Sequence, residues 1–324
     1  MTFLRLRLRQ HPAWVLYVLA PIFAEVFSSS TPLNEFLNPL AFIPLMMLYG
    51  SGALLIRELV IRWRKGWFSL LLLGMAFGIY EEGVMVRSFF DPHWMDLGAL
   101  GVYGRVAGVN WVWTEQLILF HALISIAASI AFVEILLPEQ RSKPWLNSAW
   151  IRGFHWVSLL LMIPVGKLMN AYDAPDVWIA LSWLGILLLI GAARLLPARL
   201  LPPRPEATPP RPRWFFLAGF TGVFLHFVLV SLGAEASLYP FPIAMFLVVL
   251  NALAMLWLIL RWSGNGSRWD DRHRLALIEG GLSFFLIFTP LLSGSTYPVL
   301  YVSQPVFLFL LWMAYRHIAH RFAD

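Results

Sequence analysis

The chain has 324 residues, of which 59% are hydrophobic and 13% are charged, whereas an ordinary soluble domain has about 45–50% apolar and about 25% charged residues. This composition excludes an ordinary water-soluble globular protein, because a fold of this size cannot bury so much apolar surface. The formal net charge is +6, but the basic residues are spread over short segments and form no single patch, which argues against a nucleic-acid partner. With no cysteine, disulfides, thiolate nucleophiles and cysteine metal sites are excluded, while sites of histidine and carboxylate remain open.

The apolar residues fall in blocks of about 17 to 22, the length that crosses a hydrocarbon core of ~30 Å as a helix. The sequence therefore predicts an all-α integral membrane protein in contact with the lipid bilayer. In chain order, the predicted spans are 13–30, 40–57, 67–85, 111–136, 153–169, 177–195, 214–232, 241–261, 274–292 and 298–315.

The positions of lysine and arginine predict the topology, because short segments rich in these residues are retained on the cytoplasmic side. With ten spans and the N-terminus inside, only Arg87, Arg105 and Lys167 of the 24 basic residues fall on the outer side. The inner segments hold all the others, from Arg5, Arg7 and Arg9 before the first span to Arg321 after the last. We therefore expect a multi-pass protein of the cell membrane, inner or plasma, with both termini in the cytoplasm.

Two connections between the predicted spans differ from the others in composition. The inner connection 197–213, PARLLPPRPEATPPRPR, is dense in proline and arginine, so we expect an extended, poorly packed linker. It divides the chain into a six-span block, residues 1–196, and a four-span block, residues 214–324. The longest outer connection, 86–110, contains many large apolar side chains, which favours a folded cap over the bundle and not a disordered loop.

Ionisable and amide side chains inside apolar spans are the main functional signal, since each costs roughly 2.5 to 3.5 kcal/mol at a helix centre and needs a partner or water. The set comprises Glu25, Glu81, Glu82, Glu115, His121, Glu134, His226, Asn251, Glu279 and Gln304. On the predicted topology, Glu25, Glu81, Glu82 and Glu115 lie toward the outer leaflet. His121, His226 and Asn251 lie nearer the middle of the membrane.

These positions predict an acidic, histidine-containing cavity open to the outer side. Its substrate- or ion-binding residues are expected to be Glu81, Glu82, Arg87, Glu115, His121 and His226, with Asp91 and Asp96 at the mouth and Arg87 and Arg105 as counter-charges. The Glu81–Glu82 pair carries most weight, because adjacent carboxylates repel unless they are protonated, metal-bound or paired. A simpler interpretation stays open for the others: Glu25, Glu115 and Glu134 can snorkel to the interface, and His121 and His226 can bond a neighbouring helix.

Small residues indicate where helices pack closely. Gly74 and Gly78 in GMAFG have the GxxxG spacing, and 49–53 (YGSGA) is a second such run. The chain contains no Walker loop, dinucleotide fingerprint, HExxH or GxSxG motif, so ATP-driven transport, nicotinamide chemistry and zincin chemistry have no support. No cofactor is predicted, although a cation at the glutamate–histidine cluster fits the residue types.

One family resemblance accompanies these residues. YEEGVMVR at 80–87, with FH at 120–121, resembles the glutamate-pair and histidine motifs of the CAAX-processing intramembrane proteases, which activate water with paired glutamate and histidine. That family has EExxxR, whereas this chain has EExxxxR, which moves Arg87 by about 100° around an α-helix. The aromatic residue also adjoins the histidine, and no later HxxxN or HxxxD follows.

Three functional classes therefore remain. The first is a secondary-transporter-like or solute- or ion-binding membrane protein, in which the glutamates take a small solute, a proton or a cation and His121 and His226 continue a polar path inward. The second is an intramembrane hydrolase of the glutamate–histidine type, with candidate catalytic residues Glu81, Glu82, His121, His226 and Asn251. The third is a non-catalytic structural subunit. The sequence leaves the substrate, the enzyme question and the oligomeric state open.

Overall fold

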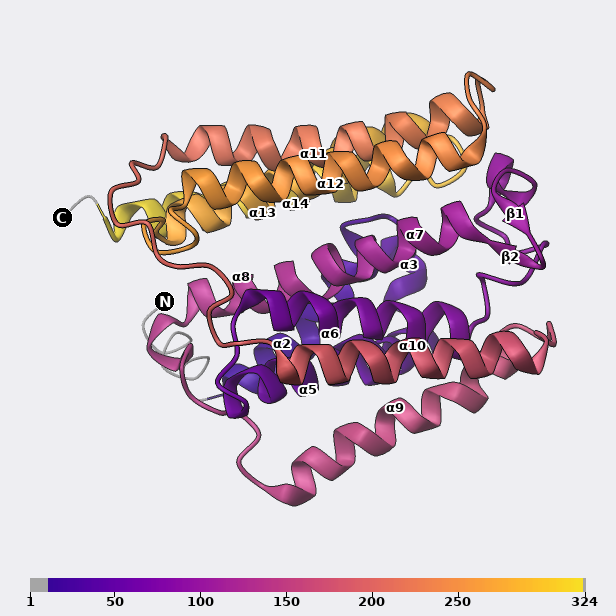
Figure 1. Ribbon diagram of the computed structural model, residues 1–324, viewed down its shortest axis with the longest axis horizontal. Helices are drawn as coiled ribbons and strands as arrows, with labels where there is room; N and C mark the ends of the chain where they lie inside the picture. Colours follow the sequence, from indigo (N-terminus) through magenta and orange to yellow (C-terminus); the bar gives the residue numbers. More distant parts are fainter. Residues whose placement is uncertain (1–10, 323–324) are drawn as a thin grey trace.

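A computed structural model describes residues 11–322, so the predicted inner residues Arg5, Arg7 and Arg9 lie outside the described part of the chain. The structure is mainly helical, and most helices run roughly along one common direction (Figure 1). In the described residues the strands are β1 (Arg105–Val106) and β2 (Val109–Asn110), which pair antiparallel. The predicted all-α fold is thus confirmed in its class.

Several helices are joined end to end, with π-helical segments between or after α-helical ones. The elements are α2 (Pro12–Pro21) with the π-helical segment Ile22–Val26, α3 (Leu33–Phe36), α4 (Pro39–Leu45), the π-helical segment Met46–Gly50, α5 (Ser51–Arg62), α6 (Trp67–Ile79) with the π-helical segment Tyr80–Met85, α7 (Trp111–Phe120), the π-helical segment His121–Ala128, α8 (Ser129–Leu136), α9 (Ala149–Met169), α10 (Asp176–Leu195), α11 (Pro212–Ala234), α12 (Phe241–Trp262), α13 (Asp271–Ser293) and α14 (Leu300–His320), with short 3₁₀ turns at Gly98–Gly101 and Pro138–Gln140.

Eight continuous helices in the described residues are long and apolar enough to cross a membrane. Each coincides with one of the predicted spans to within a few residues, which supports a multi-pass membrane protein. At the first predicted span the apolar helix Pro12–Val26 is shorter than these eight, and at the tenth lies α14, of 21 residues, which is not among them. The count of ten spans therefore remains a prediction.

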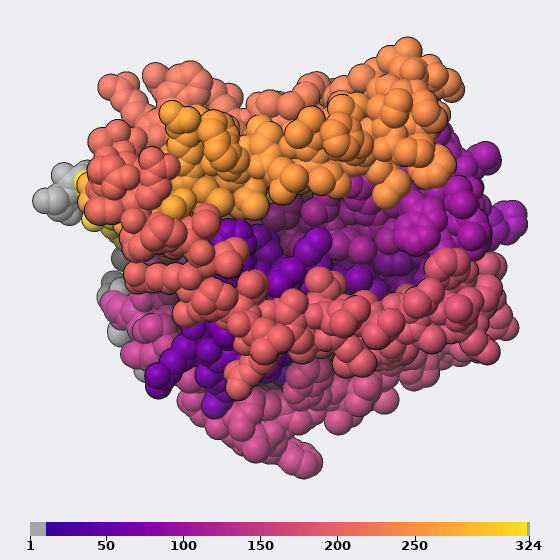
Figure 2. All heavy atoms as spheres, in the orientation of Figure 1, coloured from indigo at the N-terminus to yellow at the C-terminus, as the bar shows by residue number. Residues whose placement is uncertain are grey.

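The spans differ in how much of their surface other helices cover. In the most apolar 18-residue stretch of each span, 72% of the residues are buried in Trp67–Met85 and in Trp111–Leu136, but only 11% in α12. Large apolar side chains of α9, α10 and α12 remain exposed, as expected of helices that face lipid. The space-filling view shows α12 on the surface above the buried N-terminal helices (Figure 2).

Glycines set the closest helix contacts. On α11 and α13, a Cβ atom at Gly219 would lie 2.2 Å from the Leu277 carbonyl oxygen, and one at Gly280 would lie 2.0 Å from that of Phe216. On α6, a Cβ atom at Gly74 would lie 2.9 Å from the Ala122 Cα atom. Because only glycine permits such backbone approach, these residues fix which helices are neighbours.

The segment 86–110 is folded, as its apolar side chains predict. Its residues Phe89 and Phe90 are buried, and the Arg105 guanidinium donates hydrogen bonds to the carbonyl oxygens of Phe90 (2.9 Å) and Asp91 (3.1 Å). Arg105 therefore holds the segment together and is not a counter-charge for the glutamates.

The connection 197–213 is better packed than its composition predicts. The Lys65 ammonium donates to the Leu196 carbonyl oxygen, and the Arg204 amide donates to the Gly264 carbonyl oxygen at 3.2 Å. At the far end, the His273 ring lies 3.1 Å from the Pro210 carbonyl oxygen. Most of residues 197–211 are nevertheless exposed and none lies in a helix or strand, so the segment is an extended connection, as predicted, that a few hydrogen bonds anchor.

Candidate functional site

Three of the predicted site residues meet inside the bundle. The His121 Nε2 atom lies 3.0 Å from Glu82 Oε1, and its Nδ1 atom lies 3.3 Å from Glu81 Oε2. One potential ligand atom from each residue falls within 4.8 Å of the other two. Glu81, Glu82 and His121, here named the EEH cluster, thus have the spacing of a potential cation site.

Close helix packing brings the cluster together. Gly74 lies against the backbone of Ala122, and a Cβ atom at Gly78 would lie 3.2 Å from the Cβ atom of His121. The GxxxG spacing of α6 therefore seats the helix that carries Glu81 and Glu82 directly on the helix that carries His121. The prediction that these glycines mark close helix packing is confirmed.

Two residues from earlier helices extend the cluster. The Tyr49 hydroxyl donates a hydrogen bond to Glu25 Oε1 at 2.6 Å and also makes a short contact with Glu81 Oε1. The second oxygen of Glu25 accepts a hydrogen bond from the Thr31 hydroxyl at 2.7 Å. Since a phenol has one proton, Tyr49 can donate to only one carboxylate at a time. Glu25 does not point to the interface but is joined to the cluster through Tyr49.

Further polar side chains orient the cluster. The Ser125 hydroxyl lies 3.1 Å from His121 Nδ1. The Ser88 hydroxyl donates to Glu82 Oε2 and accepts a hydrogen bond from the Trp113 indole at 3.0 Å. His121 and Glu82 therefore have fixed partners on both sides, as expected of groups that orient a functional centre.

All the glutamates of the site, its tyrosine and its histidine lie on π-helical turns. The four π-helical segments in the described residues carry Glu25, Tyr49, the Glu81–Glu82 pair, and His121 with Ser125. A π turn inserts one extra residue and redirects the side chains that follow, and such turns occur frequently at functional sites. The backbone irregularity of four separate helices is thus concentrated where these polar side chains meet.

The site has more carboxylates than positive partners. Glu25, Glu81, Glu82 and His121 are all at least 91% buried, and Glu81 Oε2 accepts no hydrogen bond, with His121 Nδ1 3.3 Å away. The buried arginines Arg57 and Arg87 are directed elsewhere, Arg57 to Glu134 and Arg87 to the Asn170 carbonyl oxygen. Even a fully charged His121 cannot neutralise three carboxylates, so the site requires protons or an added cation.

Arg87 and Glu115 are not part of this cluster. The Arg87 guanidinium is directed to the Asn170 carbonyl oxygen, at 3.5 Å, and the backbone at Arg87 has a φ of 60°, so the chain turns away after the π-helical segment. The Glu115 Oε1 atom is buried without a hydrogen-bond partner and lies outside the group of close ligand atoms. Arg87 does not act as counter-charge to the glutamate pair.

His226, the predicted continuation of a polar path from His121, is not part of the EEH cluster. It is on α11, where its ring contacts Phe227. The Asn251 amide donates to the Gly222 carbonyl oxygen at 2.9 Å, which links α12 to α11. Asn251 therefore links two neighbouring helices, whereas the His226 ring contacts a residue of its own helix.

The acidic residues expected at the cavity mouth have separate roles. Asp91 accepts a hydrogen bond from the His93 backbone amide at 2.8 Å and so stabilises a turn. Burial, and then the negative charge of Glu82, raise the pKa of the Asp96 carboxyl. Asp96 is thus within electrostatic reach of the cluster, but the cluster itself is covered and does not form an open mouth.

Sequence reasoning missed Tyr49, Ser88 and Thr31. Tyrosine, serine and threonine are common in membrane helices and near their ends, so none of the three has the signal that a buried glutamate has. The only available hint was the position of Tyr49 at the start of the small-residue run 49–53, where helices approach closely.

Comparison with known proteins gives one match. A family model described as "Uncharacterized membrane protein family" matches residues 14–196, more than half of the chain, and this range contains the whole EEH cluster together with Glu25 and Tyr49. It ends before α11, so His226 and Asn251 lie outside it. No curated protein and no solved structure matches.

Proposed function

Because this chain belongs to an uncharacterized membrane protein family, whose matched range contains the EEH cluster, we propose that it is an ion-binding, secondary-transporter-like membrane protein that takes a divalent cation at this cluster. One observation carries the proposal: Glu81, Glu82 and His121 offer three buried ligand atoms within 4.8 Å of one another, and Glu81 Oε2 accepts no hydrogen bond although His121 Nδ1 lies 3.3 Å away.

The donor set indicates which cations suit the site. Two carboxylate oxygens and one imidazole nitrogen fit zinc, manganese or ferrous iron better than magnesium or calcium, which prefer oxygen ligands alone. A cation also supplies the positive charge that three buried carboxylates lack. Tyr49 and Ser88 then act as outer partners that orient Glu81 and Glu82.

The test is metal binding by the purified full chain. After loading with Zn²⁺ or Mn²⁺ and dialysis, metal content and affinity are measured for the wild type, Glu82→Gln and His121→Ala. We expect both substitutions to lower affinity by at least about tenfold, since even outer partners of metal ligands change affinity 10–100-fold. Glu115→Gln is the matched control, because it alters a carboxyl with a buried unpaired oxygen outside the cluster. Equal binding by all four proteins would reject the site.

Transport is tested separately in proteoliposomes. The proposal expects uptake of the same cation by the wild type and loss of uptake in Glu82→Gln. Binding without uptake would assign the cation a static role and reject the transporter part of the proposal.

An intramembrane hydrolase is the second candidate, favoured by the 3.0 Å separation of His121 Nε2 and Glu82 Oε1, since acid–base catalysis requires a glutamate within hydrogen-bond reach of a histidine. The extra residue that distinguishes EExxxxR from EExxxR falls in or next to the π-helical segment Tyr80–Met85, whose wider turn takes up one residue. One observation argues against a hydrolase: the cluster contains a single histidine in the described chain. Peptide cleavage abolished by Glu82→Gln would favour the hydrolase, and uptake without any cleavage would reject it.

A further inference from the structure

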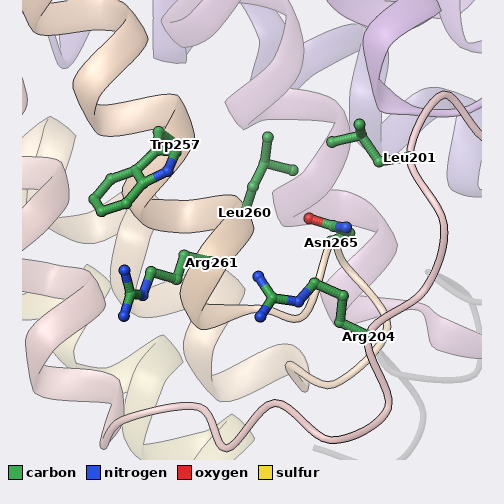
Figure 3. Close-up of a pocket in the computed structure, with 6 residues that line it drawn as sticks. All are labelled: Leu201, Arg204, Trp257, Leu260, Arg261 and Asn265. Atoms are coloured by element: carbon green, nitrogen blue, oxygen red, sulfur yellow. The ribbon is translucent and has the colours of Figure 1, made fainter.

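A cleft of about 340 Å³ lies between the connection 197–213 and the end of α12 (Figure 3). It is far along the chain from the EEH cluster and independent of the function proposed above. Its lining residues are Leu201, Arg204, Trp257, Leu260, Arg261 and Asn265. They combine two guanidinium groups and an amide with an aromatic and two aliphatic side chains.

The cleft is built by hydrogen bonds between two loops. The Asn265 amide donates to the Pro202 carbonyl oxygen at 2.8 Å, and the Arg204 amide donates to the Gly264 carbonyl oxygen at 3.2 Å. Gly264 has a φ of 60°, and a Cβ atom there would lie 2.6 Å from the Arg204 carbonyl oxygen. The two walls of the cleft are therefore held in a fixed relation by the backbone.

The charged groups of the cleft have weak partners only. Arg204 pairs with Glu206 at 3.2 Å, but both side chains are at least half exposed, and such surface pairs contribute little. The Arg261 guanidinium lies 5.3 Å from the centre of the Trp257 ring. Both guanidinium groups lie below Leu260 in Figure 3, and Trp257 and Leu201 lie on either side of it. Both arginines line the same cleft, and a guanidinium group suits a phosphate, whose oxygens its planar donors bind in pairs.

An exposed apolar stripe on α12 ends at Arg261, at the edge of the cleft. Phe246, Leu250, Leu253 and Trp257 are all exposed, and their spacing of four, three and four residues puts them on one helix face. Arg261 follows four residues after Trp257 on that face. A ligand with an anionic head at Arg261 can therefore lay an acyl chain along α12.

We propose that this cleft binds the phosphate headgroup of an anionic membrane phospholipid, whose acyl chain packs on the exposed face of α12. The apolar stripe is the reason for choosing a lipid over a free phosphate. The leaflet is the one that the inner connections face, where basic pockets at helix ends recognise anionic lipids.

The experiment is native mass spectrometry of the full chain released from nanodiscs of phosphatidylglycerol and phosphatidylcholine. We expect phosphatidylglycerol to be retained over phosphatidylcholine, and Arg204→Gln and Arg261→Gln each to reduce the retained phosphatidylglycerol several-fold. Arg316→Gln is the matched control, because Arg316 is also exposed and lies 5.3 Å from the centre of the Trp312 ring, outside the cleft.

Three results would overturn the proposal. Equal loss in Arg316→Gln and Arg261→Gln would show a general effect of surface charge. Unchanged retention in the Arg204→Gln, Arg261→Gln double variant would show that the lipid binds elsewhere. Displacement of the lipid by millimolar inorganic phosphate would identify a soluble phosphate as the occupant.

Discussion

Tyr49 illustrates at the scale of single residues what the structure adds to the sequence. Its hydroxyl joins Glu25 to Glu81, yet a tyrosine in a membrane helix carries no cost that marks it as functional. Glu81, Glu82 and His121 could be predicted, because buried ionisable groups must find partners. Glu115 and His226 have the same signal but lie elsewhere, since hydropathy gives the depth of a residue and not the neighbour that its helix face meets.

Replacing Tyr49 by Phe should weaken metal binding and lower stability. The change removes the one hydroxyl between two buried carboxylates, so we expect a loss of roughly 1–3 kcal/mol in the free energy of unfolding and about a tenfold loss in metal affinity. Unfolding in detergent and metal titration provide the measurements. Tyr103→Phe is the control, because its hydroxyl donates only to the Tyr239 carbonyl oxygen; identical effects of both changes on metal affinity would contradict the role of Tyr49.

At the scale of helices, long apolar runs predicted to within a few residues the eight helices that are long and apolar enough to cross a membrane, because length and hydropathy determine such helices. The π-helical segments Ile22–Val26, Met46–Gly50, Tyr80–Met85 and His121–Ala128 could not be predicted. A π turn leaves the hydropathy of a span unchanged and forms in response to the packing of neighbouring helices. Glu25, whose link to the cluster was not predicted, and Tyr49, which was missed, lie on two of these segments.

Gly74→Ala tests the helix contact that assembles the EEH cluster. The added Cβ atom would lie 2.9 Å from the Ala122 Cα atom, so α6 must move away from the helix that carries His121. We expect a loss of stability of about 1–3 kcal/mol and reduced metal affinity, measured by thermal unfolding and metal titration.

Gly191→Ala is the matched control for this change. Gly191 lies in α10 with nothing within 4 Å of an added Cβ atom, and glycine-to-alanine changes inside helices are otherwise stabilising by roughly 0.5–1 kcal/mol. If Gly74→Ala were as harmless as Gly191→Ala, close packing of α6 would not be what positions the glutamate pair.

At the scale of the whole molecule, the segments rich in basic residues can be placed at one end of the helical bundle. The connection 197–213 and the α12–α13 loop lie at one end of the molecule, and the β1–β2 hairpin lies at the opposite end (Figure 1). Ion pairs such as Arg57–Glu134 and Arg141–Asp271 join the segments whose basic residues predict a cytoplasmic location. Which end faces the cytoplasm follows from the lysine and arginine count alone and remains a prediction.

Single-cysteine labelling tests this orientation cleanly, because the chain has no native cysteine. Met95 and Glu206 are both exposed, one in the segment 86–110 and the other in the connection 197–213. In intact cells, a membrane-impermeant maleimide should label Met95→Cys and should label Glu206→Cys only after permeabilisation. The reverse pattern would invert the predicted topology.

The central claim is that Glu81, Glu82 and His121 together bind a cation inside the bundle. X-ray absorption spectroscopy of the zinc-loaded full chain tests it most directly, because it reports the ligands of the metal itself. The account predicts nitrogen and oxygen ligands at about 2.0–2.2 Å, with scattering from one imidazole that disappears in His121→Ala. A metal bound by two or more histidines, or a spectrum unchanged in His121→Ala, would contradict it.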